Sequence, residues 1–245
     1  MRCLRAAVLL LAAIAFGPAA AQTRSPADDT LESALVHWRA ASWYSRLGND
    51  DVTAIEIDSF RTAWQAVAAL PIGGRPSLYA KDPQWRAAAV AISKQADAAT
   101  AAADRNDGAG TAAALAQIGD LLAEARHRAG TAGFPDAVRR YRDAMDRLSG
   151  LVTFAEQRRG ASFDDAQRAQ VRQAAAECAD AVAAMETAIP PRWADDTKLR
   201  ALIRQNADGI KAVRDGLDHG ASGLDIAAAI NVARSNYYLL FLNYG

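Results

Sequence analysis

Aromatic and acidic side chains are concentrated in one stretch of the sequence, from Trp38 to Trp64. Three of the five tryptophans fall in this stretch, together with four acidic residues. Aromatic side chains can be buried where helices stack, which is the commoner outcome, or they can form the walls of a ligand groove with carboxylates at its rim. For the second interpretation, the predicted ligand-binding residues are Trp38, Trp43, Tyr44, Glu56, Asp58 and Trp64.

A second pair of residues with chemical potential is Glu124 and His127. They lie one helical turn apart and so share a face of a helix. Di-iron bundles use two such Glu-x-x-His pairs and two further glutamates. Neither His37 nor His219 follows a glutamate at this spacing, so a di-iron site is not expected. Glu124 and His127 remain the candidate metal ligands, and the simpler interpretation is a solvated pair near a helix end.

Other chemistry is poorly represented in the sequence. Soft-metal storage requires many thiols or thioethers, whereas the chain has two cysteines and three methionines. It contains no zinc-binding His-Glu-x-x-His motif, no glycine-rich phosphate loop and no Gly-x-Ser-x-Gly elbow. We therefore predict a protein that is not an enzyme and that carries no cofactor.

Helices must position these side chains, because helix signals dominate the sequence and no segment has the alternating β-branched pattern of a strand. Apolar residues recur at spacings of three and four, which predicts bundle helices that cross at about 20°. We expect an all-α fold of eight helices in up-down order. With their caps they span 25–48, 49–70, 82–106, 111–128, 134–159, 162–189, 195–217 and 221–243.

The order of the links predicts two consecutive four-helix units. A short link, a proline-containing link and a second short link occur in that order in each half of the chain. The segment 92–97 also resembles 203–208 in residue types, which favours a duplicated unit. The expected units are 22–131 and 132–245.

The N-terminus has the three parts of a secretory signal peptide. Arg2 and Arg5 precede an apolar stretch, 6–16, and small residues at Ala19 and Ala21 predict cleavage after Ala21. A signal peptide over 1–21 places the mature protein in the periplasm. No later segment approaches the roughly 20 apolar residues of a membrane-spanning helix, so no membrane insertion is expected. Equal numbers of basic and acidic residues, 28 of each, give no field that would attract nucleic acid.

Two features of the second half predict burial. Cys178, Met145 and Met185 lie on apolar seams, so core packing is expected rather than metal binding or redox chemistry. The closing stretch 236–245 is apolar nearly all round, which is typical of an enclosed helix. We expect it to join the second unit to the first, and a docking surface for a partner is the alternative.

An exported four-helix unit with a proline-containing link between its second and third helices resembles the cytochrome c-prime and cytochrome b562 class of bundles. In the c-prime type, a Cys-x-x-Cys-His motif near the end of the last helix attaches haem. The corresponding place here reads Ala123 to His127, with the histidine present and both cysteines absent. The resemblance therefore implies the architecture without covalent haem.

The sequence predicts an exported, haem-free bundle that binds an unknown small ligand or an exported protein partner. The alternative is an electron-transfer or sensor bundle that binds haem or a metal without covalent attachment. That alternative requires a methionine and a histidine that face each other from two helices.

Overall fold

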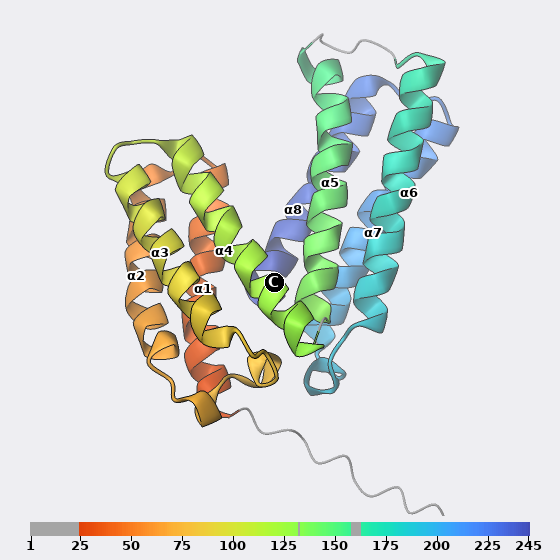
Figure 1. The fold of residues 1–245 in the computed structure, drawn as a ribbon. Helices are drawn as coiled ribbons and strands as arrows, with labels where there is room; N and C mark the ends of the chain where they lie inside the picture. Colours follow the sequence, from red (N-terminus) through yellow and green to blue (C-terminus); the bar gives the residue numbers. More distant parts are fainter. Residues whose placement is uncertain (1–24, 132, 158–162) are drawn as a thin grey trace, which may run out of the picture.

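The computed structural model describes residues 25–131, 133–157 and 163–245 (Figure 1). Eight α-helices account for most of these residues: α1 (Pro26–Arg46), α2 (Asp50–Ala68), α3 (Trp85–Ala103), α4 (Gly108–Ala129), α5 (Phe134–Gln157), α6 (Asp165–Thr187), α7 (Thr197–Asp218) and α8 (Gly223–Tyr244). Single-turn 3-10 helices, η1 (Ile72–Gly74), η2 (Ser77–Tyr79) and η3 (Pro191–Trp193), precede α3 and α7. No strand occurs within the described ranges, and the predicted all-α class is confirmed. The expected signal peptide, 1–21, lies outside them.

Side-chain caps begin most of these helices. Ser25 accepts a hydrogen bond from the backbone N–H of Asp28, whose carboxylate accepts one from Ser25 in return. This capping box satisfies two backbone donors that the first turn of α1 leaves without a helical partner. At α6 the capping box consists of Asp164 and Gln167. The expected cap at Ser162 lies outside the described residues.

The third helix begins three residues later than Asp82, where its cap was expected. The buried Asp82 carboxylate accepts hydrogen bonds from Arg128 of α4 at 3.0 Å through each of its oxygens. It also accepts one from the backbone N–H of Gln84. These bonds tie the link before α3 to the end of α4, and α3 starts only at Trp85.

The helices form two rings of neighbours. In the first half, α1 packs on α2, α2 on α3, α3 on α4, and α4 returns to α1. In the second half, α5 to α8 repeat the same order of contacts, with α8 returning to α5. Each ring has the neighbour pattern of an up-down four-helix bundle. In Figure 1 the two bundles diverge as a V, with α4 and α5 on its inner sides.

The buried apolar residues fall into two clusters, one in each bundle. Cys178, Met145 and Met185 are all buried in the second cluster, as their seams predict. Phe241 of α8 packs against both clusters, and Trp43 of α1 packs against the cluster of the second bundle. Whether 22–131 and 132–245 fold as independent units stays a prediction.

Helix α8 joins the second bundle to the first, as its apolar composition predicts. Arg39 of α1 is 2% exposed and donates hydrogen bonds to the carbonyl oxygens of Leu242 at 3.2 Å and Gly245 at 3.0 Å. Its guanidinium also pairs with Glu32. The last carbonyls of a helix lack partners within the helix, so Arg39 supplies hydrogen bonds that α8 cannot make for itself.

No helix in the described part of the chain is both long and apolar enough to cross a membrane.

Candidate functional site

Two hollows lie where α1, α4, α5 and α8 meet. The larger, which we name the tryptophan pocket, measures about 260 Å³ and is lined by Trp38, Ser42, Trp43, Arg46, Ala112, Leu115, Ala116, Arg142, Tyr237, Tyr238 and Phe241. The smaller, which we name the arginine pocket, measures about 60 Å³. The two pockets share Trp38, Arg142, Tyr237 and Phe241, so they meet across these side chains.

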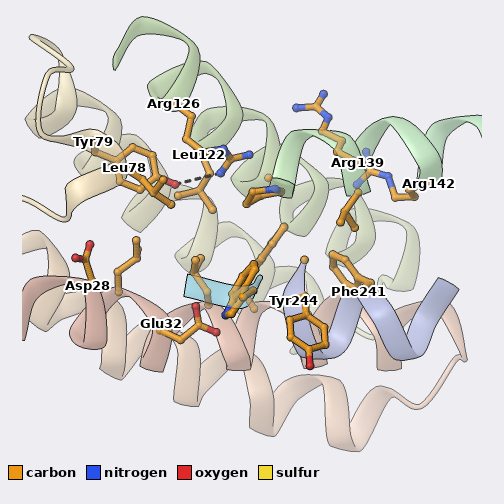
Figure 2. Close-up of a pocket in the computed structure, with 18 of the residues that line it drawn as sticks. Asp28, Glu32, Leu78, Tyr79, Leu122, Arg126, Arg139, Arg142, Phe241 and Tyr244 are labelled. Carbon is orange, nitrogen blue, oxygen red and sulfur yellow. Dashed lines mark hydrogen bonds between the residues drawn. The ribbon is translucent and has the colours of Figure 1, made fainter. Parts of the chain in front are cut away.

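Opposite charges face one another across the arginine pocket. Figure 2 shows Asp28 and Glu32 on α1, with Arg126, Arg139 and Arg142 on the opposite side. Guanidinium and carboxylate groups at this junction can hold the two bundles together or bind a charged ligand. The hydrogen bonds of each arginine distinguish these roles.

Two of these arginines are already engaged by the protein. Arg126 donates to Asp136 at 2.9 Å and to the hydroxyl of Tyr79 at 3.1 Å, the bond that is dashed in Figure 2. Burial lowers the pKa of Arg126, but Tyr79 and Asp136 outweigh it, so the pKa stays above its usual value. Arg139 pairs with Asp120 of α4 at 2.7 Å. Both arginines therefore stabilise the junction between α4 and α5.

Aromatic side chains from both bundles form the wall of the tryptophan pocket. Trp38 donates a hydrogen bond from Nε1 to the carbonyl oxygen of Leu115, at 3.0 Å, and its ring meets Phe241 edge to face at 5.8 Å. Trp43 lies against Tyr238, with 3.8 Å between the ring centroids. Because α1 supplies both tryptophans and α8 the other rings, the wall exists only when the two bundles are in contact.

A glycine makes room for the Trp38 ring. A Cβ atom at Gly119 of α4 would lie 2.9 Å from Cζ2 of Trp38, closer than side-chain carbons normally approach. Gly119 therefore allows Trp38 to lie flush against α4 and fixes one edge of the tryptophan pocket.

The structure separates the other predicted ligand-binding residues from this site. Nδ1 of His37 on α1 lies 2.7 Å from a carboxylate oxygen of Glu56 on α2, which is hydrogen-bond distance. Asp58 is exposed and pairs with Arg61 one turn away. None of these residues lines either pocket, and their role in binding stays a prediction.

Two further predicted residues are aromatic. Trp64 lies in the core of the first bundle, donates from Nε1 to the carbonyl oxygen of Ala89, and packs on Phe60 and Trp85. Tyr44 is half-buried and lines neither pocket. Of the six predicted ligand-binding residues, the structure thus brings Trp38 and Trp43 together.

The predicted metal ligands Glu124 and His127 are exposed on α4. They line an open polar groove of about 820 Å³ between α4 and α5, where Glu124 also pairs with Arg128 at 3.7 Å. Within the part of the chain that the structure describes, no group of three or more histidines, cysteines or carboxylates is placed to hold a metal.

Sequence reasoning missed the contributions of Arg46, Arg142, Tyr237 and Phe241 to the site. The apolar composition of 236–245 identified an enclosed helix, but the two arginines look like ordinary solvated side chains in the sequence. Arg46 and Arg142 line one pocket because of how the two bundles pack against each other, and no local sequence pattern predicts that packing.

Comparison of the chain with protein-family models, with curated proteins and with solved structures finds no match in any of the three.

Proposed function

We propose that this chain is a non-enzymatic binding protein that holds a small ligand in the tryptophan pocket. The observation that carries the proposal is the composition of this pocket, in which five aromatic side chains and two guanidinium groups enclose about 260 Å³. Small-molecule sites are concave, mostly apolar, often at domain junctions, and roughly 300–1,000 Å³ in volume. The tryptophan pocket has this character, and its volume lies just below that range.

Binding rather than catalysis fits the side chains in the wall. The lining residues with a nucleophilic atom are Ser42, Tyr237 and Tyr238, and the hydroxyl of Ser42 is buried without a hydrogen-bond partner. A serine becomes nucleophilic when an adjacent base takes its proton. In the described structure no base accepts a hydrogen bond from Ser42, so its hydroxyl is suited to bind a polar group.

We also propose that the chain is a haem-free relative of the cytochrome c-prime and b562 class. The support is the architecture, two four-helix units each with a proline-containing link. The haem-binding alternative needs a histidine and a methionine that face each other. His127 is exposed on α4, whereas Met145 and Met185 are buried in the second bundle, so their positions do not favour it. An absorption band on addition of haem that is lost in His127→Ala would favour that alternative over ours.

Export to the periplasm is part of the same proposal and rests on the sequence of residues 1–21. Cell fractionation followed by N-terminal sequencing tests it. We expect the protein in the periplasmic fraction with Gln22 as its first residue. A cytoplasmic protein that retains Met1 would refute export.

Binding in the tryptophan pocket can be tested by filling it. Ala112 and Ala113 are adjacent, exposed residues of α4, and only Ala112 lines the pocket. We expect the small anionic aromatic probe benzenesulfonate to bind the folded wild type, to bind Ala113→Trp equally well, and to lose affinity for Ala112→Trp. Circular dichroism confirms that both variants fold. Equal binding to both variants, or none to the wild type, would overturn the proposal.

A further inference from the structure

The charged groups in the wall of the tryptophan pocket are all of one sign. Arg46 of α1 and Arg142 of α5 line it, and no carboxylate does so. The arginine pocket, by contrast, has Asp28 and Glu32 among its lining residues. An anion in the tryptophan pocket would therefore meet two guanidinium groups, and the aspartates that pair with them, Asp143 and Asp146, lie outside the lining.

Neither arginine is saturated by the protein. Arg142 uses Nε and Nη2 to bind its neighbour Asp143, and in the described structure its Nη1 makes no hydrogen bond. Arg46 reaches Asp146 at 3.3 and 3.4 Å, beyond the ideal length for a charged hydrogen bond. The two side chains of that pair are 34% and 47% exposed, so water weakens their attraction. Arg46 also interacts with the hydroxyl of Tyr238. Both guanidinium groups can still donate hydrogen bonds to a further anion.

Two hydroxyl groups reinforce this polar end of the pocket. Ser42 Oγ is buried without a hydrogen-bond partner in the described structure, and Tyr237 also lines the wall. Burial raises the pKa of the Tyr237 hydroxyl, the charges of Arg142 and Arg46 act in the opposite direction, and Asp146 adds to the rise. An unpartnered buried hydroxyl is unfavourable, and a ligand oxygen would satisfy Ser42.

The rest of the wall is aromatic and sets the apolar part of the ligand. Trp38, Trp43, Tyr238 and Phe241 present ring faces and edges to the pocket. A planar ring packs on such a wall better than a flexible chain does, because offset and edge-to-face contacts add to its burial. A volume of about 260 Å³ lies just below the range of roughly 300–1,000 Å³ that is usual for small-molecule sites, so the ligand is small.

We propose that the tryptophan pocket selects a small aromatic carboxylate, with its ring against the tryptophans and its carboxylate on Arg142 and Arg46. This inference rests on the proposed function, because it assigns a ligand class to the same pocket. The arginine pocket is a poorer site for such a ligand, since its volume is only about 60 Å³ and Asp28 and Glu32 line it.

Phenylacetate and phenylacetamide are matched probes for this proposal, because they have the same size and shape and differ in charge. Calorimetric titration of the full-length mature protein should show phenylacetate binding at least tenfold more tightly than phenylacetamide. Arg142→Gln should weaken phenylacetate binding roughly 10- to 100-fold, the range for loss of a charged hydrogen bond. Phenylacetamide binding should change little in that variant.

Arg140→Gln is the matched control, because Arg140 lies on the same helix, is exposed and lines neither pocket. It should bind phenylacetate like the wild type. Equal affinity for the acid and the amide would overturn the choice of an anion while leaving the tryptophan pocket as a binding site. Equal effects of Arg142→Gln and Arg140→Gln would also overturn it. If neither probe binds although benzenesulfonate binds in the manner expected above, the ligand class is wrong and the proposed function stands.

Discussion

Replacement of Arg39 by methionine tests whether α8 is held against the first bundle by its guanidinium. Methionine preserves most of the aliphatic length and removes the hydrogen bonds to the carbonyls of Leu242 and Gly245 and the pair with Glu32. Hydrogen bonds to a charged group contribute about 1.5–3 kcal/mol each, and breaking a buried pair costs about 3–5 kcal/mol. We expect a loss of about 3–5 kcal/mol in the free energy of unfolding.

Thermal unfolding followed by circular dichroism measures this loss. In a protein of this size, each kcal/mol shifts Tm by roughly 2–4 °C, so Arg39→Met should lower Tm by roughly 6–20 °C. Hydrogen exchange should increase first in the last turn of α8, whose carbonyls lose their partner. Arg61→Met is the control, because Arg61 is 41% exposed and its ion pair in the described structure is with Asp58 of its own helix. We expect its effect to stay within about 0.5 kcal/mol.

A loss below about 1 kcal/mol in Arg39→Met, or a loss equal to that of Arg61→Met, would refute the reasoning. It would mean that water or other side chains satisfy the end of α8 equally well, and that apolar contacts alone join the two bundles.

Three further predictions concern single positions. Gly119→Ala should destabilise the protein by about 1–3 kcal/mol, because its Cβ would lie 2.9 Å from the ring of Trp38. Gly150→Ala should stabilise α5 by about 0.5–1 kcal/mol, because its Cβ would meet nothing within 4 Å. Chemical denaturation measures both changes in the free energy of unfolding. Burial raises the pKa of the Cys178 thiol to about 12, so Ellman's reagent at about pH 8 should label it only in unfolded protein, and rapid labelling of the folded protein would contradict its burial. Burial raises the pKa of Asp82, but the hydrogen bonds from Arg128 and the following backbone outweigh it and hold the pKa below its usual value. The ionised carboxylate therefore stabilises the fold above about pH 4, and this stabilisation is lost as the pH falls further. Asp82→Asn should lower the free energy of unfolding at about pH 7 and much less at about pH 3. An equal loss at both pH values would count against the ion pair of Asp82 with Arg128.

The sequence by itself determined the helices of this protein and most of their ends. Apolar spacings of three and four follow from the helical repeat, and caps such as Ser25 with Asp28 act within one turn, so both are readable locally. A helix end was predicted wrongly where a residue that looks like a cap instead binds a distant side chain. Asp82 looks like a helix cap in the sequence, but Arg128 of α4 holds its carboxylate and α3 begins later.

The tertiary structure alone decided the candidate site. Trp38 and Trp43 could be singled out because tryptophans are rare and cluster in the sequence, yet Glu56 and Asp58, chosen by proximity along the chain, face elsewhere. Arg142 looks like any solvated arginine until α5 meets α1 and α8. A pocket between two bundles depends on side chains about a hundred or more residues apart. Helical periodicity identifies which face of a helix is buried, but it does not identify which face of another bundle covers it.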